Sequence, residues 1–224
     1  TLFTLGMGLA ALPTGKLIDA LSRKAVVILG LIIFSLATFL TAYAQGFLDL
    51  AAYRVISGVG EAMQVTAIIA IGVTYFYKRR ALITGLVSFA YGIGAVIGPL
   101  MTAVLLNLHG WRMPFIAFGV IGIVFILLIQ FGIKPWFSEV DADKQNESEA
   151  FHGGNDLHHD GSTIWNPVTV LLSLATICAG ITSFGFFGLF PLYLRNGLGF
   201  SPTQAAAVLG LIGIGGFTAP IGGW

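Results

Sequence analysis

The chain has 224 residues, of which 56% are hydrophobic and only 9% are charged. A soluble domain would need roughly a quarter of its residues charged to cover its surface, so a water-soluble protein is excluded. The net charge of +1 gives no basic face for nucleic acid, and the single cysteine, Cys178, excludes an internal disulfide.

The apolar residues are gathered in long stretches, each near the ~20 residues that a membrane-spanning helix needs. In chain order these stretches are 1–17, 25–48, 50–77, 81–108, 113–133, 168–194 and 203–224. Continuous runs favour helices, because barrel strands alternate apolar and polar residues over only ~10 positions. The sequence therefore predicts an all-α membrane protein. We expect about seven transmembrane helices, the first and last of them cut by the ends of the sequence.

Basic residues fall mainly on alternate loops, which indicates the side of the membrane on which each loop lies. One set comprises Lys16, Arg23, Lys24, Lys78, Arg79, Arg80, Lys134 and Lys144, whereas the other loops carry Arg112 and Arg195. Because Lys and Arg near helix ends are retained in the cytoplasm, we expect the first set to be cytoplasmic. This bias predicts a multi-pass membrane protein, with a bacterial inner membrane as its expected location.

The loop after the first stretch reads GKLIDALSRK and carries Gly15, Asp19, Arg23 and Lys24. It resembles the loop after the second helix of the major facilitator superfamily, except at Ala20 and Ser22, where family members usually have a basic residue and a glycine. The resemblance implies a polytopic bundle of two six-helix halves, of which this fragment covers helices two to eight of twelve. It also implies that Asp19 belongs to a cytoplasmic gate. The alternative is an Asp that only ends a helix among basic residues.

The third stretch contains RVISGVGEA, which places Arg54 and Glu61 inside an apolar run and resembles the fourth-helix pattern of the same family. At seven residues apart, the two side chains share one helix face and lie about 10 Å apart along the axis. A charge near mid-bilayer costs about 3 kcal/mol, so such residues normally face a watery cavity. We therefore expect this face to line a transport pathway, with Gln64 beside it.

The chemistry of the pair suggests roles for both residues. Arg54 stays protonated and can attract an anionic substrate. Burial favours the neutral form of a carboxyl group, so Glu61 can act as a proton carrier. Two simpler interpretations stay open: Arg54 can extend to the outer interface, and Glu61 can be a hydrogen-bonding partner for a neighbouring helix.

The fourth stretch reads GLVSFAYGIGAVIGP and carries a glycine and proline pattern at Gly85, Gly94, Gly98 and Pro99. Gly94 and Gly98 make a smooth stripe where another helix can approach, and Pro99 permits a kink. The spacing resembles the fifth-helix motif of facilitator antiporters. Thr102 and Ala103 stand where that motif usually has glycines, which weakens the implication of antiport.

A polar segment, 134–166, separates an N-terminal transmembrane bundle, 1–133, from the start of a second bundle, 167–224. We interpret it as a cytoplasmic linker, since the spacing of His152, His158 and His159 fits no metal site. An internal match supports two related halves: Gly6, Gly8, Pro13 and Gly15 correspond to Gly213, Gly215, Pro220 and Gly222. We expect no metal, no cofactor and no enzymatic activity.

Taken together, these features predict a secondary active transporter of a small organic anion, such as a carboxylate, that works by alternating access with proton coupling. The segment YFYKRRALITGL is similar to a loop of monocarboxylate porters, and RVISGVGEA followed by GWRMPF is similar to segments of organic anion and cation symporters. One alternative is a proton-coupled drug antiporter, whose cavity Phe184, Phe186 and Phe187 could line. Another is a membrane receptor or sensor. The expected partners are a small anionic substrate, protons and lipid, and we expect a monomer.

Overall fold

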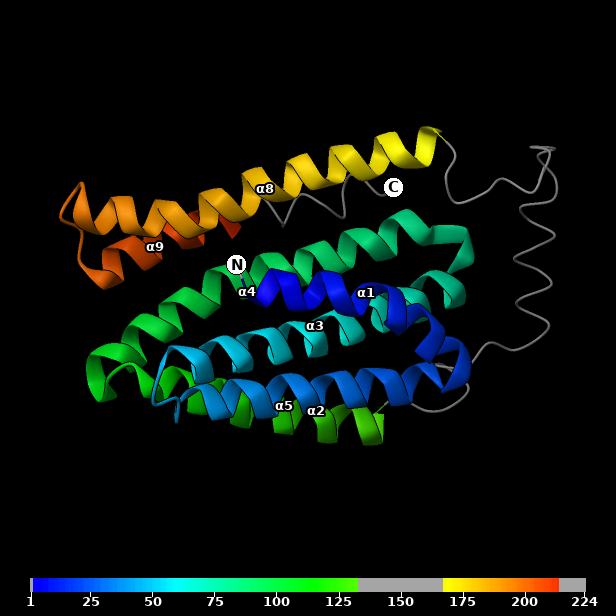
Figure 1. Ribbon diagram of the computed structural model, residues 1–224, viewed down its shortest axis with the longest axis horizontal. Coiled ribbons are helices and arrows are strands. Elements are labelled where there is room, and N and C mark those ends of the chain that lie inside the picture. Colours follow the sequence, from blue (N-terminus) through cyan, green and yellow to red (C-terminus); the bar gives the residue numbers. More distant parts are fainter. Residues whose placement is uncertain (1, 133–166, 214–224) are drawn as a thin grey trace.

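The computed structural model describes residues 2–132 and 167–213, and these residues form α-helices joined by short turns (Figure 1). The helices are α1 Leu2–Ala20, α2 Arg23–Thr41, α3 Phe47–Tyr75, α4 Arg80–His109, α5 Arg112–Gly132, α8 Pro167–Asn196 and α9 Pro202–Gly213, with a short 3₁₀ turn, η1, at Tyr77–Arg79. No strand occurs in the described ranges. The all-α prediction is confirmed.

Five helices are long and apolar enough to cross a membrane: α2, α3, α4, α5 and the Ser173–Asn196 part of α8. α1 contributes a shorter apolar helix, Leu2–Ile18. α9 is described only as far as Gly213, so most of the last predicted span, 203–224, lies outside the described residues. The predicted linker at 134–166 also lies outside them. The boundaries of the three expected regions therefore stay predictions.

The helix boundaries differ most from the prediction between the second and third spans. The apolar stretch 25–48 predicts one continuous helix, but α2 ends at Thr41 and α3 begins at Phe47. Asp49, which the prediction placed between two helices, lies in the first turn of α3, and its carboxylate accepts a hydrogen bond from the backbone N–H of Gln45 at 3.2 Å. An acidic group in a first turn stabilises the helix start, so α3 begins earlier than hydropathy alone indicates.

Glycines allow α3 to pack tightly between α1 and α2. A Cβ added at Gly58 would collide with the carbonyl oxygen of Phe3 in α1. A Cβ added at Gly60 would lie 2.5 Å from the backbone nitrogen of Phe34 in α2. Small residues let helix backbones approach closely within a membrane, where apolar burial gives little driving force between helices. The core between α2 and α3 consists of Val26, Val27, Leu31, Met63, Ala67 and Ile71.

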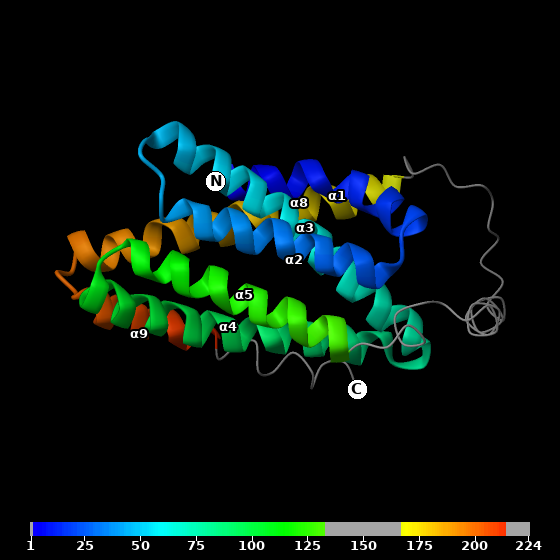
Figure 2. The same cartoon turned by 90° about the horizontal axis from the view of Figure 1, so that it is seen from below.

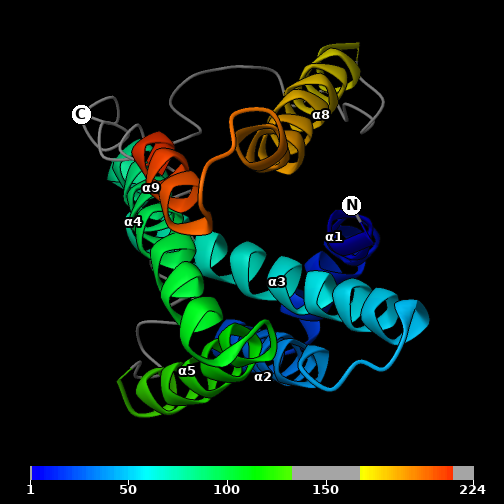
Figure 3. The ribbon, with the colours of Figure 1, turned by 90° about the vertical axis from the view of Figure 1, so that its left-hand side faces the viewer.

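The remaining helices, α4, α5, α8 and α9, pack on the outside of this core and on one another. α5 packs mainly against α2 and also contacts α4, whereas α9 packs against α4 (Figure 3). α8 is joined to α9 by a short turn and makes few contacts with it (Figures 1 and 3). Figure 2 shows the bundle from a second side. Between α8 and α9 the chain turns at Gly199, whose φ of 68° lies in the left-handed region that favours glycine. α4 is thus the element that joins the first five helices to the later segment of the chain.

Candidate functional site

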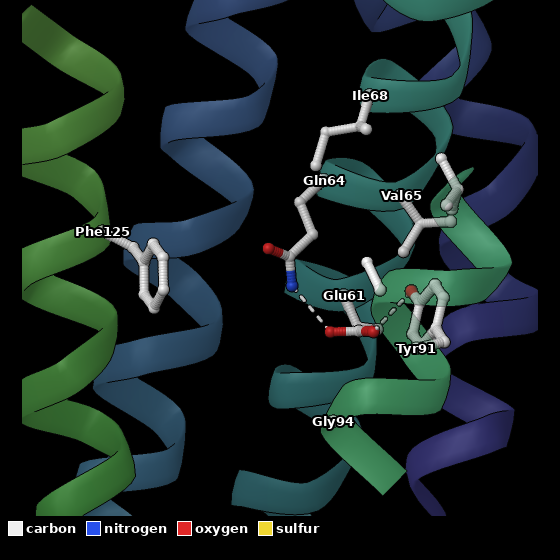
Figure 4. A pocket seen from close by; sticks show the side chains of 9 residues that line it. Glu61, Gln64, Val65, Ile68, Tyr91, Gly94 and Phe125 are labelled. Carbon is white, nitrogen blue, oxygen red and sulfur yellow. Dashed lines mark hydrogen bonds between the residues drawn. The ribbon is translucent and has the colours of Figure 1, made fainter. Parts of the chain in front are cut away.

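Glu61 lies near the middle of α3, and its carboxylate accepts two hydrogen bonds (Figure 4). Gln64, one turn further along the same helix, donates from Nε2 to Oε2 at 2.6 Å. Tyr91 of α4 donates from its hydroxyl to Oε1 at 3.1 Å. Hydrogen bonds to a charged acceptor are stronger than those between neutral groups, so these two donors hold the carboxylate in place. Gln64 thus lies beside Glu61, and its part in a transport pathway stays a prediction.

These three polar side chains line a cavity of about 500 Å³ between α3, α4 and α5. The described lining residues are Glu61, Gln64, Val65 and Ile68 from α3, Val87, Ala90, Tyr91 and Gly94 from α4, and Phe125 from α5. Figure 4 shows Gln64 extending from α3 toward the side of α5, and the Glu61 carboxylate lying between Gln64 and Tyr91 of α4. An apolar cavity with a few convergent polar groups is the usual form of a small-molecule site.

Arg54 lies on the same face of α3 as Glu61 but contacts a different neighbour. Its guanidinium carbon lies 4.8 Å from the centre of the Phe115 ring, at the start of α5. This is a cation–π contact, which partly compensates a cation that has left water. Arg54 is half-buried and is not among the described residues that line the cavity of Glu61. The structure thus shows the pair on one helix face without a direct bond between them.

The basic residues of the first loop contact carbonyl groups near the ends of two other helices. Arg23 donates from Nη1 to the carbonyl of Ala70 in α3 at 3.3 Å, and Lys24 donates from Nζ to that of Gln130 in α5 at 2.8 Å. Cations near helix C-termini stabilise the last carbonyls and the helix dipole. Gly15 is exposed, with no described atom within 4 Å of an added Cβ, and Asp19 lies in the last turn of α1. The gate role of this loop stays a prediction.

The glycine and proline pattern of the fourth stretch lies within α4, which continues through Pro99 to His109. Gly85 is buried, whereas a Cβ at Gly94 or Gly98 would meet no described atom within 4 Å. Close approach of helices is observed at Gly58 and Gly60, and the packing role of Gly94 and Gly98 stays a prediction. Gly94 lines the cavity, where its missing side chain leaves space next to Glu61.

Comparison of the sequence with known proteins identifies its family. The sequence model of the Major Facilitator Superfamily matches residues 1–224. The chain belongs to this superfamily. The resemblance of the first loop and of the third stretch is confirmed at the level of the family, as is the expectation of a multi-pass helical membrane protein.

Three relatives in the superfamily carry names that refer to different substrates. The multidrug transporter protein MdtP of Bacillus subtilis is 33% identical over 54% of this chain and 22% of its own length. The probable L-galactonate transporter of Escherichia coli is 31% identical over 55% of this chain and 27% of its own length. The probable sulfoacetate transporter SauU of Cupriavidus necator is 28% identical over 86% of this chain and 46% of its own length. All three are bacterial, which agrees with an inner-membrane location.

The chain thus spans less than half the length of each of these relatives. Its place in the superfamily nevertheless gives α3, α4 and α5 a membrane environment, in which the polar group around Glu61 needs an explanation. The described residues contain no group of three potential metal ligands, and the histidines of segment 134–166 lie outside them.

Tyr91 is the member of this polar group that the sequence analysis missed. It lies in the segment SFAYGIG, three residues before Gly94, and the glycine pattern of this segment predicts helix packing but no polar contact. A tyrosine inside a membrane helix needs a hydrogen-bond partner for its hydroxyl, and that requirement was a usable signal. The sequence gives no signal for which residue the partner is, because Glu61 is thirty positions away on another helix.

Proposed function

We propose that the full-length protein is a secondary active transporter that moves a small organic anion by alternating access and couples this movement to protons. One observation carries the proposal: the carboxylate of Glu61, inside a membrane helix, is held by Gln64 and Tyr91 at a cavity of about 500 Å³. An ionisable group at membrane depth is expensive and is normally retained for a function. No catalytic reaction is assigned to these residues.

Glu61 is the proposed proton carrier. A carboxylate in a mostly apolar cavity gains from neutralisation by a proton and gains from its two donors when it is ionised. Proton binding and release by this group would follow a change in its surroundings. In an alternating carrier, that change is the exposure of the cavity to one side of the membrane or the other.

Arg54 is the residue that we propose attracts the anionic substrate. Its positive charge lies two turns from Glu61 on the same face of α3, and its contact with Phe115 leaves the planar guanidinium available for a bidentate bond to a carboxylate. The names of two relatives, for L-galactonate and sulfoacetate, are those of organic anions. Together these observations support an anionic substrate. The proposed transport unit is a monomer in the lipid bilayer.

The deciding experiment uses the full-length protein in sealed liposomes, with labelled L-galactonate and sulfoacetate as probes and an inward proton gradient as the variable. We expect uptake to rise with the gradient and to fall when a protonophore collapses it. Glu61→Gln, which resembles the protonated acid, should lose the response to the gradient. Asp49→Asn is the matched control, because this exposed acid at the start of α3 lies away from the cavity, and it should keep the response.

Uptake of neither probe, or uptake that ignores the gradient in the unaltered protein, would contradict the proposal. Binding of a probe without its passage across the membrane would instead favour a receptor or sensor.

A drug antiporter is the second candidate, and the likeness to MdtP favours it. The cavity is lined mainly by apolar side chains, and on α8 the ring of Phe186 stacks on that of Phe190 with centroids 4.6 Å apart. Aromatic surfaces of this kind bind lipophilic cations. The same liposomes distinguish the two candidates: export of a lipophilic cation in exchange for protons, with no uptake of the organic anions, would favour the antiporter.

A further inference from the structure

The segment GWRMPF, residues 110–115, leads into α5 and carries two aromatic rings that contact arginines. The guanidinium carbon of Arg54 in α3 lies 4.8 Å from the centre of the Phe115 ring. The Phe115 ring meets that of Trp111 edge to face, with centroids 6.3 Å apart. The guanidinium carbon of Arg112 lies 4.6 Å from the centre of the Trp111 ring. The two arginines are therefore connected through two rings in contact.

The start of α5, which carries the Phe115 ring, is fixed to α2. Arg112 donates from Nε to the carbonyl oxygen of Ala42, at the end of α2, at 2.9 Å. Two turns further along α5, a Cβ added at Gly119 would lie 2.7 Å from the Cβ of Phe39, so the two helices also pack closely there. The start of α5 cannot move away from α2 without loss of these contacts. The ring under Arg54 thus has a position that does not depend on Arg54.

Arg54 and Arg112 differ in what their N–H groups meet. Both guanidinium groups lie over a ring, and Arg112 also donates to a carbonyl oxygen. Within the described part of the chain, no acceptor bonds to the guanidinium of Arg54. A ring beneath a guanidinium covers one face and leaves the N–H groups along its edge open. Half-buried in α3, Arg54 therefore presents donors that an anion can use.

We infer that Phe115 is the positioning residue of Arg54: its ring holds the guanidinium at the contact of α3 with α5 and leaves the N–H groups for the anionic substrate. This inference rests on the proposed function, because the anion gives the open donors their purpose. Without the ring, the long side chain of Arg54 is free to extend to the outer interface. The anion would then have to order that side chain as it binds, which weakens the binding.

The first test replaces the ring in the full-length protein and measures uptake of L-galactonate and sulfoacetate into liposomes at one fixed proton gradient. In Phe115→Leu we expect the concentration at half-maximal uptake to rise about fivefold, as for the loss of one cation–π contact, while the maximal rate changes less than about twofold. Phe115→Tyr keeps the ring and should stay close to the unaltered protein. Phe131→Leu is the matched control, because this side chain near the far end of α5 is 84% exposed.

The second test separates the charge of the ring from its bulk. Phenylalanines with one, two and three fluorine atoms at position 115 withdraw negative charge from the ring face with little change in size, so the attraction for a cation falls stepwise. We expect the logarithm of the concentration at half-maximal uptake to rise with each fluorine. If the unaltered protein transports and the three analogues bind the anions equally well, the inference is overturned, even if Phe115→Leu weakens uptake, because packing alone would then explain that loss.

A third measurement does not depend on transport. The fluorine NMR signal of a monofluorinated phenylalanine at position 115 should shift in Arg54→Gln, which removes the cation from the ring, and should stay in place in Asp49→Asn. An unchanged signal in Arg54→Gln overturns the inference whether or not the protein transports. A shifted signal without uptake of either anion by the unaltered protein overturns the proposed function and upholds the contact between Phe115 and Arg54. The two failures are therefore distinguishable.

Discussion

At the scale of single residues, Arg54 and Glu61 occupy one face of α3 yet contact different helices. The guanidinium of Arg54 lies over Phe115 of α5, and the carboxylate of Glu61 bonds to Tyr91 of α4. A direct ion pair would cancel both charges and leave neither free for a ligand. In the proposed transporter, this separation leaves the positive group for the anion and the negative group for the proton.

Replacement of Arg54 tests the first of these roles. Arg54→Gln removes the charge, so we expect the concentration of an organic anion at half-maximal uptake to rise at least about tenfold, as for the loss of one charge-assisted hydrogen bond. Arg54→Lys keeps the charge but not the planar fork, so it should recover only part of this affinity. Substrate-concentration series in liposomes provide the measurement. Equal affinity in all three proteins would remove Arg54 from the substrate site.

The sequence could predict the pair because a single period fixes it: seven positions in a helix return a side chain to the same face. Gln64 followed from the same period. Tyr91 did not, because its bond to Glu61 depends on how α4 packs against α3, and no local pattern contains that register. The contact of Arg54 with Phe115 was missed for the same reason.

At the scale of helices, Gly60 and Gly94 have opposite surroundings although both are helical glycines. An added Cβ at Gly60 would lie 2.5 Å from the backbone nitrogen of Phe34 and 2.6 Å from the carbonyl oxygen of Gly30. Backbone atoms cannot rotate away as a side chain can, so the two helices would have to separate. At Gly94 an added Cβ meets no described atom within 4 Å.

We therefore expect Gly60→Ala to destabilise the protein by about 1–3 kcal/mol, the usual cost of overpacking. Gly94→Ala is the control, since the methyl group enters the cavity and alanine favours the helix. Thermal unfolding of both variants in the same detergent provides the comparison. A loss at Gly94 as large as the loss at Gly60 would contradict the close contact between α2 and α3.

Hydropathy predicted the existence of these helices because a membrane span needs a long apolar run whatever its neighbours. It failed between Thr41 and Phe47, because a short turn does not interrupt a hydropathy pattern that extends over about 20 residues. Asp49, which hydropathy places between helices, lies inside the first turn of α3. It also could not tell which glycines meet another helix. A small residue permits close approach, but the partner that uses it comes from tertiary packing.

At the scale of the whole molecule, α4 connects the proposed proton site with the later part of the chain. One part of α4 carries Tyr91 and Gly94 at the cavity, and the adjoining turns pack against α9. A movement of α9 that carries α4 with it would alter the distance from Tyr91 to Glu61. The hydrogen bond between Tyr91 and Glu61 can therefore respond to the relative position of α4 and α9.

Cross-linking tests this connection directly. An added Cβ at Gly210 of α9 would lie 3.7 Å from the Cα of Val96 in α4 and 3.9 Å from its Cγ1, a separation that suits a disulfide. We expect Val96→Cys with Gly210→Cys to cross-link on mild oxidation, in a Cys178→Ser background that removes the cysteine of this sequence. With a protease site inserted at 134–166 and cleaved, the two fragments should migrate together until a reductant is added.

Gly8→Cys with Gly210→Cys is the control, since no described atom lies within 4 Å of a Cβ at Gly8. If both pairs cross-link to the same small extent, α4 and α9 do not pack as described, and Tyr91 loses its link to the later part of the chain.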